Sequence, residues 1–156
     1  MKKHLIVYYS RTGICKKVAE KAKEILGDDA DIEEIIDEKN RKGFLRGIAA
    51  VLDAYKNNIT RIGAVRLNPS EYEETIIVTP VWANRPADAV RTYLAAYASD
   101  IKSLTLITCA GASDGEAVKK DIFQRFLIKT KILLPLKAKD IKNGNIDLTP
   151  IKGRTV

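Results

Sequence analysis

Metal-binding and cross-linking residues are scarce in this chain. Two cysteines, Cys15 and Cys109, and one histidine, His4, stand among 156 residues, and no Cys-x-x-Cys pair occurs. Two cysteines are too few for a disulfide scaffold, and together with the histidine they are too few for a structural zinc site. We therefore expect neither a disulfide framework nor a bound metal.

Long hydrophobic runs are also missing. No apolar stretch approaches the roughly 20 residues of a membrane-spanning helix, and the apolar strand after Met1-Lys2-Lys3-His4 is too short for the core of a signal peptide. Hydrophobic residues nevertheless make up 46% of the chain, a content that argues against disorder. We expect a single cytoplasmic domain over residues 1–156, with no membrane partner.

Acidic residues are outnumbered by basic ones. The chain has 27 Lys and Arg against 20 Asp and Glu, a net charge of +7. Such a balance can favour nucleic acid or acidic protein partners. The basic residues are spread along the chain, however, and no helix-turn-helix, zinc-finger or RNA-binding aromatic motif is present. A solvated basic surface is therefore expected rather than a nucleic-acid interface.

The most informative stretch joins a strand, a small-residue loop and a helix. The apolar strand Leu5–Tyr9 leads into Ser10-Arg11-Thr12-Gly13, and a helix is predicted over Ile14–Leu26 because its apolar residues share one face. A helix amino end carries unpaired N–H donors and partial positive charge, so the loop is a candidate anion site. It lacks the Gly-Lys-Ser/Thr of a Walker A loop and the three glycines of a dinucleotide fingerprint. We expect a phosphate or another anion there; a ligand-free turn is the alternative.

The rest of the chain alternates between strands and helices. Four more strands are expected, at Ala30–Ile36, Thr75–Thr79, Leu104–Thr108 and Ile132–Leu136. Three more helices are expected, over Phe44–Tyr55, from Pro86 through Tyr97, and from a capping box at Ser113 through Phe126. Residues 56–74 form a long connection, and residues 80–85 form a loop.

This alternation predicts an α/β protein with a three-layer α/β/α sandwich. Right-handed crossovers between five parallel strands place helices on both faces of the sheet. We expect the strand order 2-1-3-4-5. Pro135 fits one edge strand because proline donates no ladder hydrogen bond, and the charged strand that contains Asp31 fits the other edge. Such a sheet binds its ligand beyond the carboxyl ends of strands 1 and 3.

Three segments then resemble those of flavodoxins and flavodoxin-like FMN-binding proteins. Tyr9-Ser10-Arg11-Thr12-Gly13 is similar to the phosphate loop of that family, and Thr79-Pro80-Val81-Trp82-Ala83 is similar to its second flavin loop. The segment Leu67–Glu73, just before the third strand, is also similar. The resemblance covers nearly the whole chain. It implies the flavodoxin-like fold, non-covalently bound FMN, and one- or two-electron transfer.

The resemblance assigns the phosphate to the first loop. It implies that Ser10 and Thr12 hydrogen-bond the FMN phosphate through their hydroxyl groups. Backbone N–H groups would complete the cradle, from Arg11, Gly13, Ile14 and Cys15.

The flavin ring is assigned to the other two loops by the same resemblance. Trp82 would flank the ring, whose flat apolar face favours aromatic stacking, and Pro80 and Val81 belong to the same loop. Ala83 and Asn84 would lie near the ring edge; capping of the next helix is the alternative role for Asn84. The other side of the ring would be lined by Cys109, Ala110 and Gly111.

Departures from the family pattern bear on function. Ile14 and Cys15 replace a more polar pair and remove one side-chain phosphate contact, and residues 109–114 include no aromatic residue to complete a two-sided sandwich. Arg11 and Arg85 are expected near the site, where positive charge favours the anionic reduced flavin and raises its potential relative to an acidic relative. For the two cysteines, a redox role is the alternative to that of small buried hydrophobes.

The expected function is electron transfer through FMN, to a redox partner protein or a small-molecule acceptor. One alternative is a small FMN-dependent oxidoreductase that uses NAD(P)H or a protein as donor and a quinone or another small acceptor. A flavin-free signalling or polyanion-binding domain on the same fold is the other alternative. No side chain stands out as a general acid or base, so no catalytic residue is expected.

Overall fold

A parallel sheet forms the centre of the molecule. The structure is a computed structural model and describes residues 2–38, 60–112 and 114–152. The parallel strands are β1 (His4–Tyr8), β2 (Ala30–Glu34), β3 (Glu74–Trp82), β5 (Leu104–Ala110) and β6 (Thr130–Lys137). Their spatial order is β2-β1-β3-β5-β6. This confirms the predicted order 2-1-3-4-5, and the two-residue strand β4 (Arg85–Pro86) adds an antiparallel pairing to β3.

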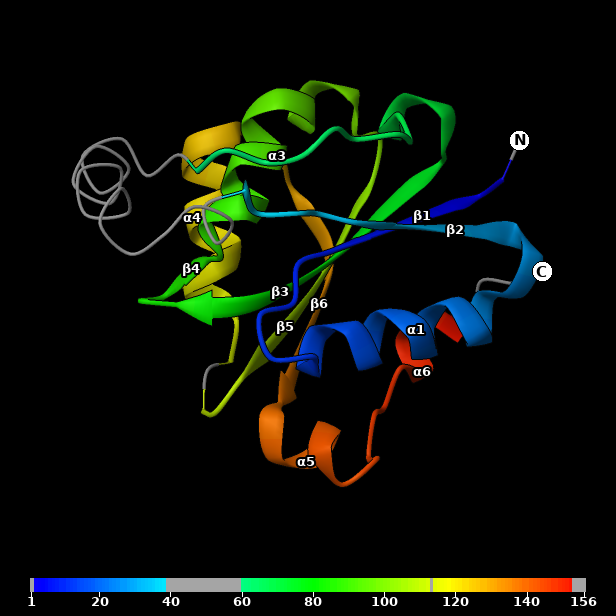
Figure 1. Cartoon of the computed structure of the whole chain (residues 1–156), viewed down its shortest axis with the longest axis vertical. Helices are drawn as coiled ribbons and strands as arrows, with labels where there is room; N and C mark the ends of the chain where they lie inside the picture. The colour runs from blue at the N-terminus through cyan, green and yellow to red at the C-terminus, as the bar shows by residue number, and fades with distance from the viewer. Residues whose placement is uncertain (1, 39–59, 113, 153–156) are drawn as a thin grey trace.

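Helices cover both faces of the sheet, as Figure 1 shows. On one side lie α3 (Asp88–Tyr97) and α4 (Glu116–Phe126), and on the other α1 (Ile14–Leu26), α5 (Ala138–Lys142) and α6 (Thr149–Lys152). Short 3-10 turns span Gly27–Asp29, Pro69–Glu71 and Ala98–Asp100. The three-layer prediction is confirmed. The predicted helix Phe44–Tyr55 lies outside the described residues.

The layers follow from alternation along each strand. In β1, Leu5 and Val7 enter the core under α3 and α4, whereas Ile6 and Tyr8 enter the core under α1. All five residues of β1 are buried. A strand that is apolar throughout is typical of the centre of a parallel sheet covered on both faces. The carboxyl end of β1, where the candidate anion loop begins, is therefore held by both cores.

Both predicted sheet edges are confirmed among the described strands. β2 pairs only with β1, and its central residues are only partly buried. β6 pairs with β5 and carries Pro135, which is exposed. Proline is tolerated at an edge because one row of N–H groups there has no partner strand.

The segment predicted as a loop over residues 80–85 is a β-hairpin instead. β3 continues to Trp82, and Val81 pairs with Pro86 while Trp82 pairs with Arg85. Ala83 and Asn84 form the turn with φ of 49° and 62°. Two positive φ angles are typical of a two-residue turn whose twist matches the strands it joins. The prediction that Pro86 opens the next helix is therefore wrong: α3 begins at Asp88.

The predicted capping box at Ser113 is also wrong as the start of its helix. α4 begins at Glu116, and its N-cap is Gly115, with φ of 76°. A Cβ on Gly115 would lie 2.8 Å from Thr108 Oγ1, so both the backbone angle and the close approach require glycine. The Asp114 carboxylate accepts a 3.1 Å hydrogen bond from the Glu116 N–H. Ser113 itself lies outside the described residues.

The connection before β3 is ordered where it is described. Asp37 forms an isolated antiparallel bridge with Ile62, and the Thr60 hydroxyl donates a 2.9 Å hydrogen bond to Asp37 Oδ1. Asn68 caps the turn over Pro69–Glu71 by accepting a 2.9 Å hydrogen bond from the Ser70 N–H. None of the described helices has the length and apolar content needed to cross a bilayer.

Candidate functional site

A cavity of about 430 Å³ opens at the carboxyl edge of the sheet. Three chain segments from the ends of β1, β3 and β5 meet there, and a fourth comes from the start of α5. Its lining residues are Ser10, Arg11, Thr12, Ile14, Cys15, Pro80, Trp82, Cys109 and Ala138. The structure thus brings the predicted phosphate loop, the tryptophan and one residue of the third loop around one space.

The loop between β1 and α1 is organised by Gly13. This residue is the N-cap of α1 with φ of 88°, and its N–H donates a 3.1 Å hydrogen bond to Ser10 Oγ. The N–H predicted to bind phosphate is therefore used inside the loop. No atom lies within 4 Å of the position a Cβ would take on Gly13, so the backbone angle rather than space calls for glycine.

The amino end of α1 favours a negative charge. Its first turn contains no acidic residue. Arg11 and Thr12 are exposed at the mouth of the cavity. Because unpaired N–H groups and the helix dipole already favour an anion, a nearby guanidinium and hydroxyl strengthen the same preference. This end of the cavity therefore has the electrostatics that favour an anion.

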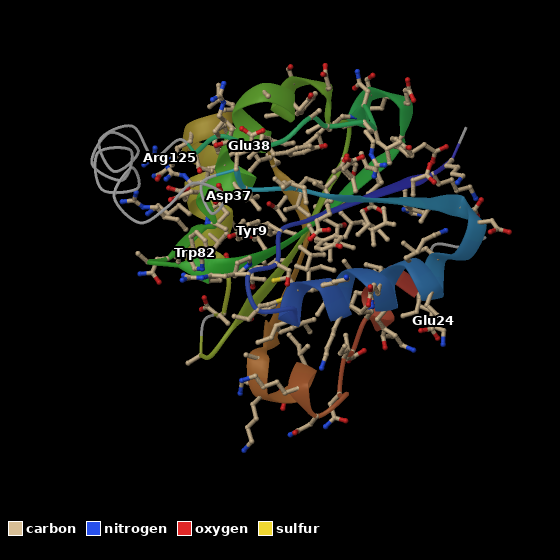
Figure 2. The ribbon with its side chains drawn as sticks, in the orientation of Figure 1. Tyr9, Glu24, Asp37, Glu38, Trp82 and Arg125 are labelled. Atoms are coloured by element: carbon tan, nitrogen blue, oxygen red, sulfur yellow. The ribbon has the colours of Figure 1, made fainter. Side chains whose placement is uncertain are left out.

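Trp82 is braced by an aromatic contact. Its ring meets Tyr9 edge to face, with centroids 5.6 Å apart and an interplanar angle of 88°, and Figure 2 shows both side chains at this edge. Tyr9 is only 5% exposed, whereas Trp82 is half-buried. Edge-to-face packing is a favoured aromatic geometry. Tyr9 thus belongs to the core, as expected, and it holds the Trp82 ring at the cavity wall.

Thr79 fixes the hairpin that carries Trp82. Its buried hydroxyl donates a 2.9 Å hydrogen bond to the Pro80 carbonyl and accepts a 3.1 Å hydrogen bond from the Ala87 N–H. The bond from Ala87 joins the returning arm of the hairpin to the outgoing arm, and the bond to Pro80 orients the hydroxyl within the outgoing arm. Sequence reasoning placed Thr79 at the end of the strand and at the start of the second flavin loop, and gave it no positioning role.

A second cavity, of about 530 Å³, lies on the other side of the hairpin. Its lining residues are Val81, Ala83, Asn84, Ala110, Ala112, Asp114 and Ala117. Successive side chains of a strand point to opposite faces, so Trp82 lines the first cavity and its neighbour Val81 lines the second.

Asn84 lies in the hairpin turn and Ala87 is the N-cap of α3, so the capping role considered for Asn84 is wrong. Gly111 is exposed and is not among the lining residues of either cavity.

The two cysteines meet beside the first cavity. Cys15 and Cys109 are both buried free thiols, and their side chains are hydrogen-bonded to each other. The hydrogen bond to Cys109, followed by burial, raises the pKa of the Cys15 thiol well above its usual range. Cys15 is therefore protonated at neutral pH. Its place in the first turn of α1 does not activate it.

Ala138 is the lining residue that sequence reasoning missed. It follows β6 directly, and Lys137 at the end of β6 is in register with Ala110 of β5. All parallel strands end at the same edge, so the residue after the last strand was a candidate on topology alone.

Among the described residues, no group of three or more His, Cys, Asp or Glu side chains is placed to hold a metal.

Comparison with known proteins finds no matching family model and no matching curated protein. Solved structures do match. A candidate flavoprotein from Bacteroides uniformis is 17% identical, with 97% of this chain and 96% of that chain covered and a TM-score of 0.74. A flavoprotein from Lactobacillus acidophilus, solved in complex with FMN, is 21% identical over 92% of this chain and 98% of that chain, with a TM-score of 0.64. A WrbA-like flavodoxin from Agrobacterium tumefaciens is 15% identical over 97% and 89%, with a TM-score of 0.56.

These likenesses extend over nearly the whole length of both chains, at low sequence identity. They agree with the strand order and with the helices on both faces. The chain has the flavodoxin-like fold.

Proposed function

We propose that this chain binds FMN non-covalently and transfers electrons through it. One observation carries the proposal: the anion loop, Trp82 and Cys109 line the same cavity of about 430 Å³. That volume is within the usual range for sites that bind small molecules. A solved flavoprotein with this fold is in complex with FMN.

The anion loop fits the phosphate of FMN. Ser10 Oγ already accepts a hydrogen bond from the Gly13 N–H, so its own proton is available to a ligand oxygen. Thr12 adds a second hydroxyl, and Arg11 adds a charge. A phosphate dianion needs several donors, and the start of α1 supplies further backbone N–H groups.

The wall at Trp82 fits the flat flavin ring. Trp82, Pro80 and Cys109 present mostly apolar surface to the cavity. Tyr9 fixes the tryptophan plane, which reduces the entropy lost when a ring stacks on it. Bound FMN supplies one- or two-electron chemistry, and the protein residues bind it, orient it and set its electrostatics. Arg11 at the cavity mouth favours the anionic reduced state.

The second cavity favours an FMN-dependent oxidoreductase as a second candidate function. It lies on the other side of the hairpin from Trp82 and is lined by small residues and Asn84. A small acceptor such as a quinone would have room there beside the ring edge. A carrier would instead pass its electrons to a redox partner protein at the exposed Ala83–Asn84 turn.

A cytoplasmic location is part of the same proposal. Two cysteines among 156 residues do not form the disulfide framework that is typical of small secreted domains, and such low cysteine use is common in reducing compartments.

The test is a titration of the purified protein with FMN, followed by flavin fluorescence and visible absorbance. We expect quenching at a 1:1 ratio. We expect Thr12→Ala to raise the Kd about 10-fold, as loss of a hydrogen bond to a charged group does, and Trp82→Ala to raise it about 30-fold.

Two matched variants serve as controls. Ser99→Ala removes an exposed hydroxyl from the opposite edge of the sheet, and Phe123→Ala removes a ring that is 44% exposed on α4. Both should bind FMN like the wild type. Unchanged FMN fluorescence at high micromolar protein would overturn the proposal.

A further inference from the structure

Two sulfur atoms lie side by side in one wall of the candidate FMN cavity. Cys15 is in the first turn of α1, and Cys109 is near the end of β5. Both residues line the cavity, and they are 3% and 6% exposed. The chain contains no other cysteine. Any disulfide within one molecule must therefore join these two residues.

The two residues are close enough together to be candidates for a disulfide. They line one cavity and pack in the same core cluster, and a hydrogen bond to Cys109 is the main cause of the raised pKa of Cys15. A disulfide needs the sulfur atoms about 2.05 Å apart, which is shorter than any thiol–thiol hydrogen bond. Oxidation therefore has to draw the start of α1 and the end of β5 closer together.

We propose that Cys15 and Cys109 form a reversible dithiol–disulfide pair, oxidised by a low-molecular-weight disulfide, and that the disulfide form binds FMN more weakly. The second part rests on the proposed function. The first part concerns the two residues alone.

The reaction is thiol–disulfide exchange, which needs no other oxidant. The Cys109 sulfur, after losing its proton, attacks one sulfur of the small disulfide and releases the first thiol. Cys15 then loses its proton and attacks Cys109 Sγ, which forms the Cys15–Cys109 bond and releases the second thiol. Two S–H bonds of the protein become two S–H bonds of the small thiols. Because the pKa of Cys15 is raised, the second step accelerates with rising pH.

The link to FMN binding follows from the position of Cys15. Its backbone N–H, like that of Ile14, belongs to the start of α1 that forms the anion site. Drawing Cys15 toward β5 moves these donors away from the phosphate position, and hydrogen bonds weaken steeply as their distance and angle depart from the optimum. By linkage, FMN must then stabilise the dithiol by the same factor.

The first measurement uses the full chain in glutathione buffers of graded redox potential. Free thiols are alkylated, and the intact mass is recorded with and without FMN. We expect both thiols to disappear together. A 10-fold weaker FMN affinity of the disulfide form corresponds to a midpoint potential about 30 mV higher, that is more positive, when the protein is saturated with FMN. Cys15→Ala and Cys109→Ala should yield only mixed disulfides with glutathione, whereas the FMN Kd of the double variant Cys15→Ala/Cys109→Ala, which has no thiol, should not vary with buffer potential.

The second measurement is the FMN Kd of the wild type in fully reducing and fully oxidising buffer. We expect it to rise about 10-fold on oxidation. Two free thiols in the most oxidising buffer would show that Cys15 and Cys109 form no disulfide, whether or not the protein binds FMN. A disulfide with an unchanged FMN Kd would overturn the coupling while the proposed function stands. If FMN binds in neither buffer, the proposed function and the coupling are both wrong. The intact masses would still show whether Cys15 and Cys109 form a disulfide.

Discussion

The two edges of the sheet use their polar groups differently. At the amino edge, polar side chains bond to one another in the interior. His4 Nδ1 lies 2.9 Å from Glu74 Oε2, and the Thr105 hydroxyl donates a 2.6 Å hydrogen bond to Glu74 Oε1. These side chains are buried, with Glu74 5% exposed.

At the carboxyl edge, polar groups face open space instead. Ser10, Arg11 and Thr12 line a cavity, and the turn at Ala83 and Asn84 is exposed. The loops of this edge also contain positive φ angles, at Gly13, in the hairpin turn and at Gly115.

The difference teaches where stability and binding are located in this fold. Bonds that close on themselves in the interior hold strands together, whereas donors that face a cavity remain available to a ligand. Variants at the amino edge should therefore change stability with little effect on FMN affinity. Variants of the cavity-facing side chains at the carboxyl edge should mainly do the reverse, whereas the glycines of that edge also hold the backbone of its loops.

The largest effect is expected at Glu74. Glu74→Ala removes the acceptor for both Thr105 and His4 in a buried site, and we expect the free energy of unfolding to fall by about 3 kcal/mol. Urea denaturation measures it, with the exposed neighbour Glu73→Ala as the control. The FMN Kd of the folded variant should stay within about twofold of the wild type. A loss no larger than in the control would mean that this network does not hold the amino edge.

Two glycines at the carboxyl edge distinguish the cost of steric crowding from the cost of a strained backbone angle. Gly115→Ala places a Cβ 2.8 Å from Thr108 Oγ1 in addition to the strain at φ of 76°, and should cost about 2 kcal/mol of stability. Gly13→Ala meets no atom within 4 Å and should cost about 1 kcal/mol. Thermal unfolding of the two variants checks the order. Equal losses would show that packing against Thr108 contributes nothing.

Ser10 should affect binding more than stability. Ser10→Ala removes the acceptor for the Gly13 N–H and one hydroxyl of the anion site. We expect the FMN Kd to rise about 5-fold, close to 1 kcal/mol, and the free energy of unfolding to change by less than about 0.5 kcal/mol. Fluorescence titration and urea denaturation measure the two quantities. A larger change in stability than in binding would break the contrast between the edges.

The effect that is smallest at neutral pH is an alkaline loss of stability that both edges share. Burial, helped by Glu34, raises the pKa of Tyr8 to about 12, and burial, helped by the bond to Asp31, raises the pKa of Tyr72 to about 12. In the unfolded chain both phenols titrate near 10.0, so unfolding releases protons between these values. Stability should therefore fall as pH rises from about 10 to about 12.

Tyr8→Phe and Tyr72→Phe test this pH dependence. Each should flatten the decline of the urea midpoint between pH 9 and pH 11, because each removes one phenol whose pKa shifts on folding. A decline as steep as in the wild type for both variants would assign the alkaline loss to other groups.

Much of the fold follows from patterns within single segments. The bounds of α1 are those predicted, because Gly13 and Gly27 flank one continuous amphipathic pattern. The strand order follows from alternation of strands and helices, and Pro135 indicates the edge correctly. The anion loop was predicted from the strand and helix on either side of it, whereas the role of Trp82 was implied by the resemblance to flavodoxins.

Features that depend on distant contacts could not be predicted in this way. Pro86 is compatible both with a helix start and with an edge strand, and only the pairing of Val81 with Pro86 decides between them. Residues of the predicted second flavin loop line two different cavities, and they do so because β3 continues past Thr79. The contact between Cys15 and Cys109 joins two segments that are far apart in sequence.

The most direct test of the account is a two-dimensional amide NMR titration of the protein with FMN. We expect the largest shifts at the amides of residues 10–15, at the Trp82 indole and at Cys109, with the amides of His4, Glu74 and Thr105 nearly unchanged. Such a pattern would place the ligand at the carboxyl edge. Shifts centred on the amino edge, or none at saturating FMN, would contradict the account.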